Sequence, residues 1–279
     1  MEPTSSSKLK VAIIPLDITL AEVDTNLGRA YDALSLVDHD TDLVVLPELF
    51  NSGFTTDPDL LKRIAEEDYG RTMKEVKGWA ASYGFAICGS FAGKSGGRFY
   101  NRGFIVKPDG EVSFYNKRHL FRLGGEYKTY GCGTAESPIV DVKGWKIMMA
   151  ICYDIRFPVW NRNAGLKYDV LVVPANWPHV REYAWKHLLI ARAIENQAYV
   201  VGCNRSGSDE FGDYPVDDSF AFDYMGADIA RREENGIMYC EFDRDKLLTG
   251  RNRFKAWLDA DSFHINIAQA DEESAAAKV

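Results

Sequence analysis

The chain has 279 residues, with 33 basic and 41 acidic side chains and a formal net charge of −8. This acidic balance argues against nucleic acid or an anionic membrane as the main partner, and no apolar stretch approaches the ~18 residues that a membrane span needs. Hydrophobic residues make up 46% of the chain and charged residues 27%, which is typical of a globular protein that folds without disulfides or metal.

In the first half of the chain, short apolar runs alternate with helical patterns. Strands are expected at 11–14, 43–46, 85–88, 99–106 and 112–115, and helices at about 19–37 and 59–83. The turn Pro108-Asp109-Gly110 joins the last two strands, so these predict an antiparallel hairpin.

The second half repeats this alternation. Strands are expected at 139–142, 145–151, 170–173, 199–203, 220–223 and 237–242, and helices at about 158–166 and 182–197. Several strands are apolar on both faces, so helices should cover them. About ten to twelve strands exceed what one twisted sheet usually carries. We therefore predict a single α/β domain over residues 1–268, with two stacked mixed sheets, and a disordered tail at 269–279.

The N-terminus and the cysteines together predict a cytoplasmic protein with reduced thiols. Residues 1–8 are polar and lack the apolar segment of a secretory signal. The cysteines are odd in number and include no Cys-x-x-Cys pair. Three lie in apolar runs and are expected to be core residues: Cys88, Cys203 and Cys240. Cys132 lies in a glycine-rich loop and is interpreted as an incidental exposed thiol.

Three reactive side chains follow predicted strands directly: Glu48, Lys117 and Cys152. Open α/β sheets present their ligand-binding groups at strand ends. A carboxylate buried there has the raised pKa of a base, a lysine beside it offsets the cost of burial, and a cysteine at a turn exposes its sulfur. Each residue alone is more often a cap, an ion pair or a core residue. The combination of the three predicts a catalytic site.

Motifs for other chemistries are absent. The chain contains no G-x-G-x-x-G, G-x-x-x-x-G-K-[ST], H-E-x-x-H or G-x-S-x-G segment. Nucleotide cofactors and zinc-dependent hydrolysis therefore have little support, and we expect neither a metal nor a cofactor.

Three segments resemble the signatures of the nitrilase, or carbon–nitrogen hydrolase, superfamily, and they occur in that family's order: 46–50 (LPELF), 115–121 (YNKRHLF) and 151–158 (ICYDIRFP). The sequence around Cys152 is most similar to the bacterial ω-amidase branch, and the likeness runs from about Lys10 to Ile265. The resemblance implies a four-layer αββα sandwich with two mixed sheets, which assembles as a homodimer or a larger homo-oligomer.

The resemblance also implies a role for each site residue. Glu48 matches the general base, Lys117 the lysine that stabilises the oxyanion, and Cys152 the nucleophile. The backbone N–H of Tyr153 would complete the oxyanion site. Glu126 matches a second glutamate that positions the substrate and the lysine, with a plain surface-loop carboxylate as the alternative.

The implied substrates are small ω-amides of dicarboxylic acids, such as 2-oxoglutaramate and 2-oxosuccinamate, hydrolysed to the acid and ammonia through a thioester. Because these substrates are anionic, a cation besides Lys117 is expected in the site. Arg156 is the first candidate, with an ion pair to Asp154 as its alternative role, and Arg122 and His119 are others. Two aromatic residues either line the site or belong to the core: Phe121 and Trp177.

Three other functions stay open. Another branch of the superfamily would act on nitriles, N-carbamoyl compounds or aliphatic amides. A papain-like Cys–His hydrolase would leave Glu48 and Lys117 without a role. A non-catalytic binding protein on the same fold is expected to have lost at least one of the three site residues, whereas this chain keeps them all.

Overall fold

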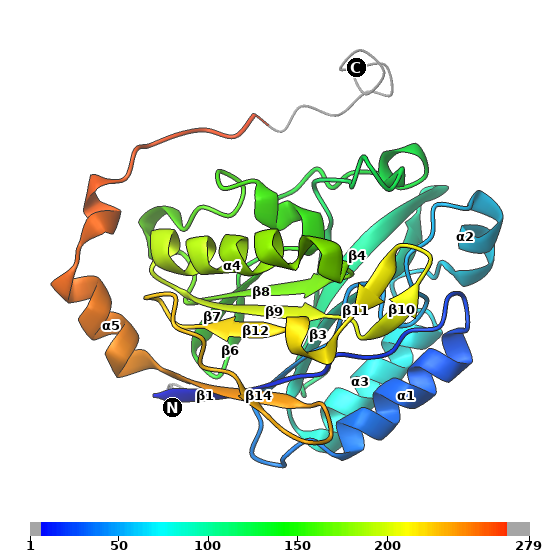
Figure 1. Cartoon of the computed structure of the whole chain (residues 1–279), viewed down its shortest axis with the longest axis horizontal. Coiled ribbons are helices and arrows are strands. Elements are labelled where there is room, and N and C mark those ends of the chain that lie inside the picture. Colours follow the sequence, from blue (N-terminus) through cyan, green and yellow to red (C-terminus); the bar gives the residue numbers. More distant parts are fainter. Residues whose placement is uncertain (1–6, 267–279) are drawn as a thin grey trace.

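A computed structural model of the chain describes residues 7–266. Two β-sheets are stacked face to face, and helices cover the outer side of each (Figure 1). The predicted four-layer αββα sandwich with two mixed sheets is therefore confirmed. The expected tail at 269–279 lies outside the described residues.

The first sheet has seven strands in the order β13-β14-β1-β2-β3-β4-β5. Pairs β1–β2 and β2–β3 are parallel and the other neighbours are antiparallel, so the sheet is mixed. Its strands have these bounds: β1 (Lys8–Ile13), β2 (Leu43–Val45), β3 (Ala86–Ser95), β4 (Arg98–Val106), β5 (Val112–Asn116), β13 (Arg231–Arg232) and β14 (Met238–Asp243).

The second sheet has five strands in the order β12-β9-β8-β7-β6, with three parallel strands between antiparallel edges. Its strands have these bounds: β6 (Val140–Val142), β7 (Trp145–Met149), β8 (Val170–Ala175), β9 (Tyr199–Asn204) and β12 (Phe220–Phe222). A separate hairpin consists of β10 (Gly207–Asp209) and β11 (Gly212–Tyr214).

Helices α1 (Val23–Ser35) and α3 (Arg71–Tyr83) pack against the outer face of the first sheet, and α4 (Glu182–Asn196) packs against the second. Two further helices are α2 (Pro58–Ile64) and α5 (Arg244–Arg253). The 3₁₀ turns are η1 (Glu126–Lys128), η2 (Cys152–Arg156), η3 (Ala164–Leu166), η4 (His179–Arg181), η5 (Val216–Asp218) and η6 (Ala256–Asp259). None of the helices within residues 7–266 has the length and apolar character of a membrane span.

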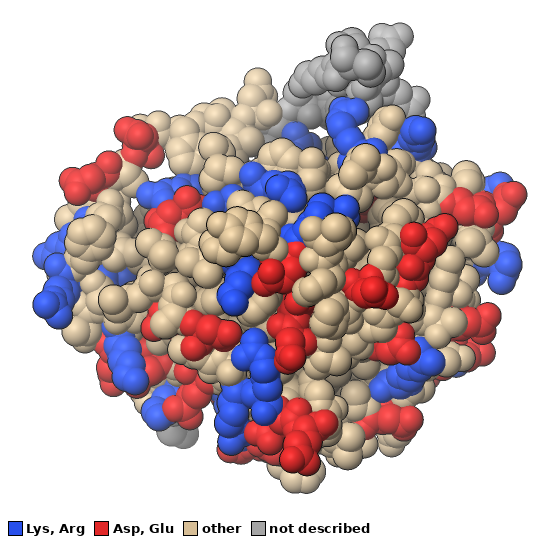
Figure 2. Space-filling model, viewed as in Figure 1, with Lys and Arg blue, Asp and Glu red and all other residues tan. Residues whose placement is uncertain are grey.

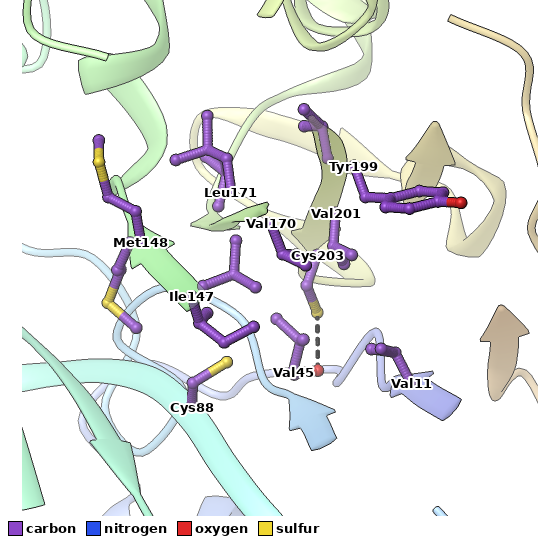
Figure 3. Close-up of a cluster of buried hydrophobic side chains, with 14 of the residues drawn as sticks. Val11, Val45, Cys88, Ile147, Met148, Val170, Leu171, Tyr199, Val201 and Cys203 are labelled. Atoms are coloured by element: carbon purple, nitrogen blue, oxygen red, sulfur yellow. Dashed lines mark hydrogen bonds between the residues drawn. The ribbon is translucent and has the colours of Figure 1, made fainter. Parts of the chain in front are cut away.

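Strand alternation builds the two apolar layers. On β1, Val11 and Ile13 face the second sheet, whereas Ala12 belongs to the layer beneath α1 and α3. Figure 3 shows the layer between the sheets, where the sulfur of Cys203 donates a hydrogen bond of 3.2 Å to the carbonyl oxygen of Val45. The expectation that three cysteines are core residues is confirmed, since all three are buried: Cys88, Cys203 and Cys240.

The helix predicted over 59–83 is in fact two helices, α2 and α3, with a break between them. In the break, Glu66 pairs with β3: its backbone N–H donates to Ala92 and its carbonyl accepts from Lys94. The Glu66 carboxylate then accepts hydrogen bonds from the backbone and hydroxyl of Thr72, in the first turn of α3. The segment is not helical because its backbone bonds to the sheet and its side chain caps the next helix.

The helix predicted at 158–166 is also wrong, because only the short turn η3 forms there. Asn161 and Asn163 donate from their side chains to backbone carbonyls, including those of Asp154 and Tyr168, which favours turns over a continuous helix. The sequence-based prediction missed α5, β13 and the β10–β11 hairpin. Within α5 only Leu247 and Arg251 are buried, so it has no clear apolar stripe.

Candidate active site

Three predicted site residues form one buried cluster of charges. The Lys117 Nζ atom lies 2.8 Å from Glu48 Oε1 and 2.9 Å from Glu126 Oε2. Each side chain is at most 1% exposed. The strand ends that carry Glu48 and Lys117 meet because β2, β3, β4 and β5 are neighbours in the first sheet. Two carboxylates around one ammonium offset part of the large cost of burying these charges.

The pKa values in the cluster follow from burial and mutual attraction. Burial acts to lower the pKa of the Lys117 ammonium, but Glu126 and Glu48 together hold it well above 10.5. Burial raises the pKa of Glu126, Glu48 raises it further, and Lys117 opposes both effects. Lys117 is therefore a fixed positive charge at neutral pH.

Glu126 is not a surface-loop carboxylate. It begins η1, its side chain is fully buried, and its Oε2 atom accepts a hydrogen bond of 2.6 Å from the backbone N–H of Phe121. The alternative interpretation of this residue is therefore wrong. The segment between Lys117 and η1 therefore folds back so that the Glu126 carboxylate binds the Lys117 ammonium.

Asn101 on β4 is a site residue that the sequence-based prediction missed. Its Nδ2 atom donates to Glu48 Oε1 at 2.7 Å and to Glu126 Oε1 at 3.2 Å. The hydroxyl of Ser90 donates to its Oδ1 atom, which fixes the orientation of the amide. The available signal was a polar residue inside an otherwise buried strand, since such a residue needs internal partners.

Cys152 begins η2, is separated from the end of β7 by Ala150 and Ile151, and is 8% exposed. Its φ of +45° lies in the left-handed region, a strained conformation that is common at functional sites. The thiol donates to the carbonyl oxygen of Asn176 at 3.8 Å. Burial raises its pKa well above 9.0, and the negative charge of Glu48 adds to this effect while Lys117 opposes it. The resting sulfur is thus a protonated thiol.

Asn176, at the end of β8, connects Cys152 to Glu48. Its backbone N–H donates to Glu48 Oε2 at 2.9 Å, and its side chain donates to the Glu48 carbonyl at 3.0 Å. Both carboxylate oxygens of Glu48 therefore have hydrogen-bond donors, with Lys117 and Asn101 on one and Asn176 on the other. This arrangement fixes the carboxylate in place beside the thiol.

Asp154 joins the cysteine turn to the segment around Lys117. Its fully buried carboxylate accepts from the Tyr115 hydroxyl at 2.8 Å, from the Ile151 N–H at 3.1 Å, and from the backbone N–H of His119 at 2.8 Å. The ion pair considered between Asp154 and Arg156 is therefore absent among residues 7–266. The ring of His119 also contacts Asp154 at 2.8 Å, so this candidate cation is already engaged.

The remaining predicted substrate-binding residues contact aromatic rings. The exposed Arg156 guanidinium lies 4.7 Å from the centroid of the Trp177 ring. Trp177 is itself buried and stacks on Trp185, so it is partly a core residue. The ring of Phe121 meets that of Tyr153 edge-on at 5.3 Å.

Arg122 is exposed and lies over the ring of Tyr127, another exposed residue. Within residues 7–266, its side chain makes no hydrogen bond or ion pair with the charge cluster. In the same part of the chain, no group of three or more His, Cys, Asp or Glu side chains is arranged to hold a metal ion.

Comparisons with known proteins agree on one family. A sequence model of the carbon–nitrogen hydrolase family matches residues 10–251. The omega-amidase YafV of Escherichia coli (strain K12) is 38% identical over 259 residues, which cover 92% of this chain and 98% of the relative. The 2-oxoglutaramate amidase of Bacillus subtilis (strain 168) is 34% identical over 240 residues, which cover 85% of this chain and 91% of the relative.

A solved structure shows the same architecture. It is a CN-hydrolase superfamily protein from Xanthomonas campestris with an arsenic adduct in its active site. The two structures align with a TM-score of 0.87 and 35% sequence identity, over 93% of this chain and 99% of the other.

Proposed function

The chain belongs to the carbon–nitrogen hydrolase family and is an amidase, and we propose that it hydrolyses the ω-amide of small dicarboxylic acid monoamides, such as 2-oxoglutaramate and 2-oxosuccinamate. The observation that carries this proposal is the buried Glu48–Lys117–Glu126 cluster beside the Cys152 thiol. The names of the two curated relatives, an omega-amidase and a 2-oxoglutaramate amidase, support the substrate class.

The first step is attack of sulfur on the amide carbon. Because burial and Glu48 keep the resting thiol protonated, the nucleophile requires a base as the C–S bond forms. Glu48 is held beside it by Asn176, whose carbonyl also accepts from the thiol. Glu48 takes the thiol proton, and the electron pair of the carbonyl moves onto its oxygen.

Lys117 and the backbone N–H of Tyr153 stabilise the resulting oxyanion. The ammonium remains protonated at neutral pH because two carboxylates surround it. A fixed donor of this kind typically lowers the barrier by about 3–4 kcal/mol. Glu126 and Asn101 hold Lys117 and Glu48 at their observed separation and so act as positioning residues.

Two further transfers complete the reaction. Glu48 returns its proton to the leaving nitrogen, the C–N bond breaks, and ammonia leaves behind a thioester on Cys152. Glu48 then takes a proton from water as the water oxygen attacks the thioester carbon. The C–S bond breaks, the acid is released, and Glu48 returns its proton to the sulfur.

Arg156 is the residue that we propose binds the carboxylate of the substrate. It ends the 3₁₀ turn that Cys152 begins, which places its backbone about 8 Å from that of Cys152 along the turn. Its guanidinium has no carboxylate partner among residues 7–266 and lies on the ring of Trp177. A guanidinium held in this way offers two parallel donors to a carboxylate.

Ammonia release tests the proposal. Wild type and Cys152→Ala are compared on 2-oxoglutaramate, succinamate, glutamine, asparagine, a simple nitrile and an N-carbamoyl amino acid. We expect rapid release from the two ω-amides and none from the variant. Activity confined to the nitrile or the carbamoyl compound would show that the chain acts on that class of substrate and not on ω-amides. Absence of any Cys152-dependent turnover, with no unusually reactive thiol, would favour a non-catalytic binding protein.

The chain is further proposed to assemble as a homodimer. Two apolar side chains near the start of α4 are largely exposed, Val180 at 81% and Tyr183 at 74%, and Ile194 lies exposed on the same helix. Burial of such side chains between two copies would remove apolar area from water. Sedimentation of a single species of 31.4 kDa at micromolar concentration would contradict the dimer.

A further inference from the structure

A second arginine beside the candidate active site lacks a carboxylate partner. Arg181 ends η4, is half-buried, and has no ion pair among residues 7–266. In this respect it matches Arg156. A half-buried guanidinium without an internal anion has lost part of its hydration and has not regained it from the protein.

An aromatic ring holds the charged group of Arg181 in place. The guanidinium lies 5.5 Å from the centroid of the Phe121 ring, within the range of a cation–π interaction. Its backbone is fixed as well, because the indole Nε1 of Trp177 donates to the Arg181 carbonyl at 2.9 Å. Trp177 therefore supports both cations, since Arg156 stacks on its ring.

Phe121 and Trp177, which supply these two rings, contact or neighbour residues of the candidate active site. The backbone N–H of Phe121 donates to Glu126, and the Phe121 ring contacts that of Tyr153, the neighbour of Cys152. Trp177 follows Asn176, which contacts both Glu48 and the thiol. The Arg181 guanidinium thus lies on the ring of Phe121, which contacts Tyr153. The Arg156 guanidinium lies on the ring of Trp177, which follows the thiol's partner Asn176.

Other cations near the site are already committed. The Arg205 guanidinium is 2% exposed and paired with Asp209, and Arg118 donates to the Gly133 carbonyl. His119 is bonded to Asp154 and Lys117 to its two carboxylates. Arg122 also lacks an ion pair within residues 7–266, but its guanidinium lies over the exposed ring of Tyr127. Arg156 and Arg181 instead lie on Trp177, which follows Asn176, and on Phe121, which contacts Tyr153.

The overall charge makes local cations necessary for an anionic substrate. The net charge of −8 repels anions at long range, and Figure 2 shows acidic and basic side chains interspersed over the face viewed. Attraction of a carboxylate must therefore come from groups within about one Debye length, roughly 8 Å at physiological salt.

We propose that Arg181 is a second carboxylate-binding residue, which acts with Arg156 to select anionic ω-amides over neutral amides. This inference rests on the proposed ω-amidase function. Arg181 is a specificity-determining residue that approaches the substrate from the Phe121 side, whereas Arg156 approaches from the Trp177 side. It takes no part in proton transfer, so turnover of a neutral amide does not depend on it.

The test compares succinamate with butyramide, which has a methyl group in place of the carboxylate. We expect Arg181→Gln to lower kcat/KM for succinamate by about 10- to 100-fold, mainly through KM, because one charge-assisted hydrogen-bonding partner is lost. Butyramide should change less than about 2-fold, since it presents no charge to Arg181. Arg181→Lys keeps the charge without the planar fork and should give an intermediate loss.

The matched control is Arg231→Gln. This exposed arginine also lies over an aromatic ring, that of Tyr239, but it is on β13 and is paired with Glu233. It should leave both substrates unchanged. Binding of succinamate to Cys152→Ala, measured by calorimetry with and without Arg181→Gln, reports the same contact without turnover. We expect the variant to raise Kd by the same factor.

The outcomes separate the two proposals. If wild type prefers succinamate over butyramide but Arg181→Gln keeps that preference, the role of Arg181 is overturned and the ω-amidase function stands. An equal loss on both amides would assign Arg181 a structural role and also overturn the inference. If wild type shows no preference for succinamate and Cys152→Ala does not bind it, the substrate class itself fails, and the role of Arg181 fails with it.

Discussion

Lys117 lies in the charge cluster and Arg181 lies on a ring that contacts Tyr153, and the protein pairs the first of these cations but not the second. Lys117 is at most 1% exposed and lies within 3 Å of an oxygen from each of two carboxylates, at 2.8 and 2.9 Å. Arg181 is half-buried, rests on the ring of Phe121, and lacks a carboxylate within residues 7–266. The first charge is neutralised by the fold, whereas the second is left for an external partner.

The difference follows from the cost of desolvation. A fully buried ammonium is tolerated only with compensating anions, and these same anions hold the pKa of Lys117 well above 10.5. A half-buried guanidinium keeps some water and needs only a ring to orient it. A charge that is internally paired therefore suits a step of the chemistry, and one that is unpaired suits recognition of the substrate.

Replacing the paired charge is expected to have the largest effect. Lys117→Met would leave Glu48 and Glu126 buried without a cation, so we expect the free energy of unfolding to fall by about 3–5 kcal/mol. The kcat should fall by about 10²- to 10³-fold as the oxyanion donor is lost. Urea unfolding and ammonia release measure the two effects. Lys62→Met is the control, because this exposed lysine pairs with the exposed Asp59.

A loss of less than about 1 kcal/mol in the free energy of unfolding of Lys117→Met would contradict the contrast drawn between the paired Lys117 and the unpaired Arg181. Burial of the two carboxylates would then not depend on the ammonium, contrary to the expected cost of an unpaired buried charge.

Removing one anion of the cluster should have a smaller effect. Glu126→Gln keeps the size of the side chain but leaves Lys117 with a single carboxylate, Glu48. We expect kcat to fall by about 10- to 100-fold with little change in KM, because the lysine is held less firmly. Steady-state kinetics on succinamate test this, with Glu136→Gln as an exposed control. A change confined to KM would instead place Glu126 in substrate binding.

Asp154→Asn sharpens the comparison by disturbing the connection between the cysteine turn and the lysine segment. The asparagine side chain keeps one acceptor oxygen. The hydrogen bonds from Tyr115, Ile151 and His119, which end on a carboxylate in the wild type, become weaker. We expect a stability loss of about 1–3 kcal/mol and roughly a tenfold lower kcat. Asp109→Asn, in an exposed turn, serves as control. Unchanged kcat with reduced stability would assign Asp154 a purely structural role.

The smallest expected effect concerns the Cys152 thiol. The folded-state pKa of Cys152 is raised above 9.0, so the unfolded chain releases this proton first as pH rises. Stability is therefore complete below about pH 9 and declines above it, by about 1.4 kcal/mol per pH unit for one thiol.

Urea unfolding between pH 8 and 10 should give a shallower decline for Cys152→Ala than for wild type. The half-exposed Cys132 provides the control variant, Cys132→Ala. Equal slopes for wild type and Cys152→Ala would mean that the thiol titrates normally in the folded protein.

The fold was largely predictable because its strands are apolar and separated by clear turns. The strands around Val11, Val45 and Val170 lie where their sequence pattern placed them. The failures occurred where a polar side chain bonds outside its own segment. Glu66 pairs with β3 and caps α3, and Asn161 bonds to the turn after Cys152, so neither stretch forms the helix that its composition favours.

The site was predictable in part because its reactive side chains follow strands directly. Glu48, Lys117 and Cys152 each come at a strand end, and their signatures resemble one family. Asn101 and Asp154 carry no comparable local signal. Their importance lies in contacts with residues 53 and 39 positions away, Glu48 and Tyr115.

The sequence by itself determined the alternation of strands and helices, the membership of the family and the three reactive residues, because these depend on local pattern and on short motifs. Only the tertiary structure decided which charges are paired. It buried Glu126 against Lys117 and left Arg156 and Arg181 on aromatic rings. Burial and the distance between remote side chains set the cost of each charge and its pKa, and no stretch of sequence encodes either quantity locally.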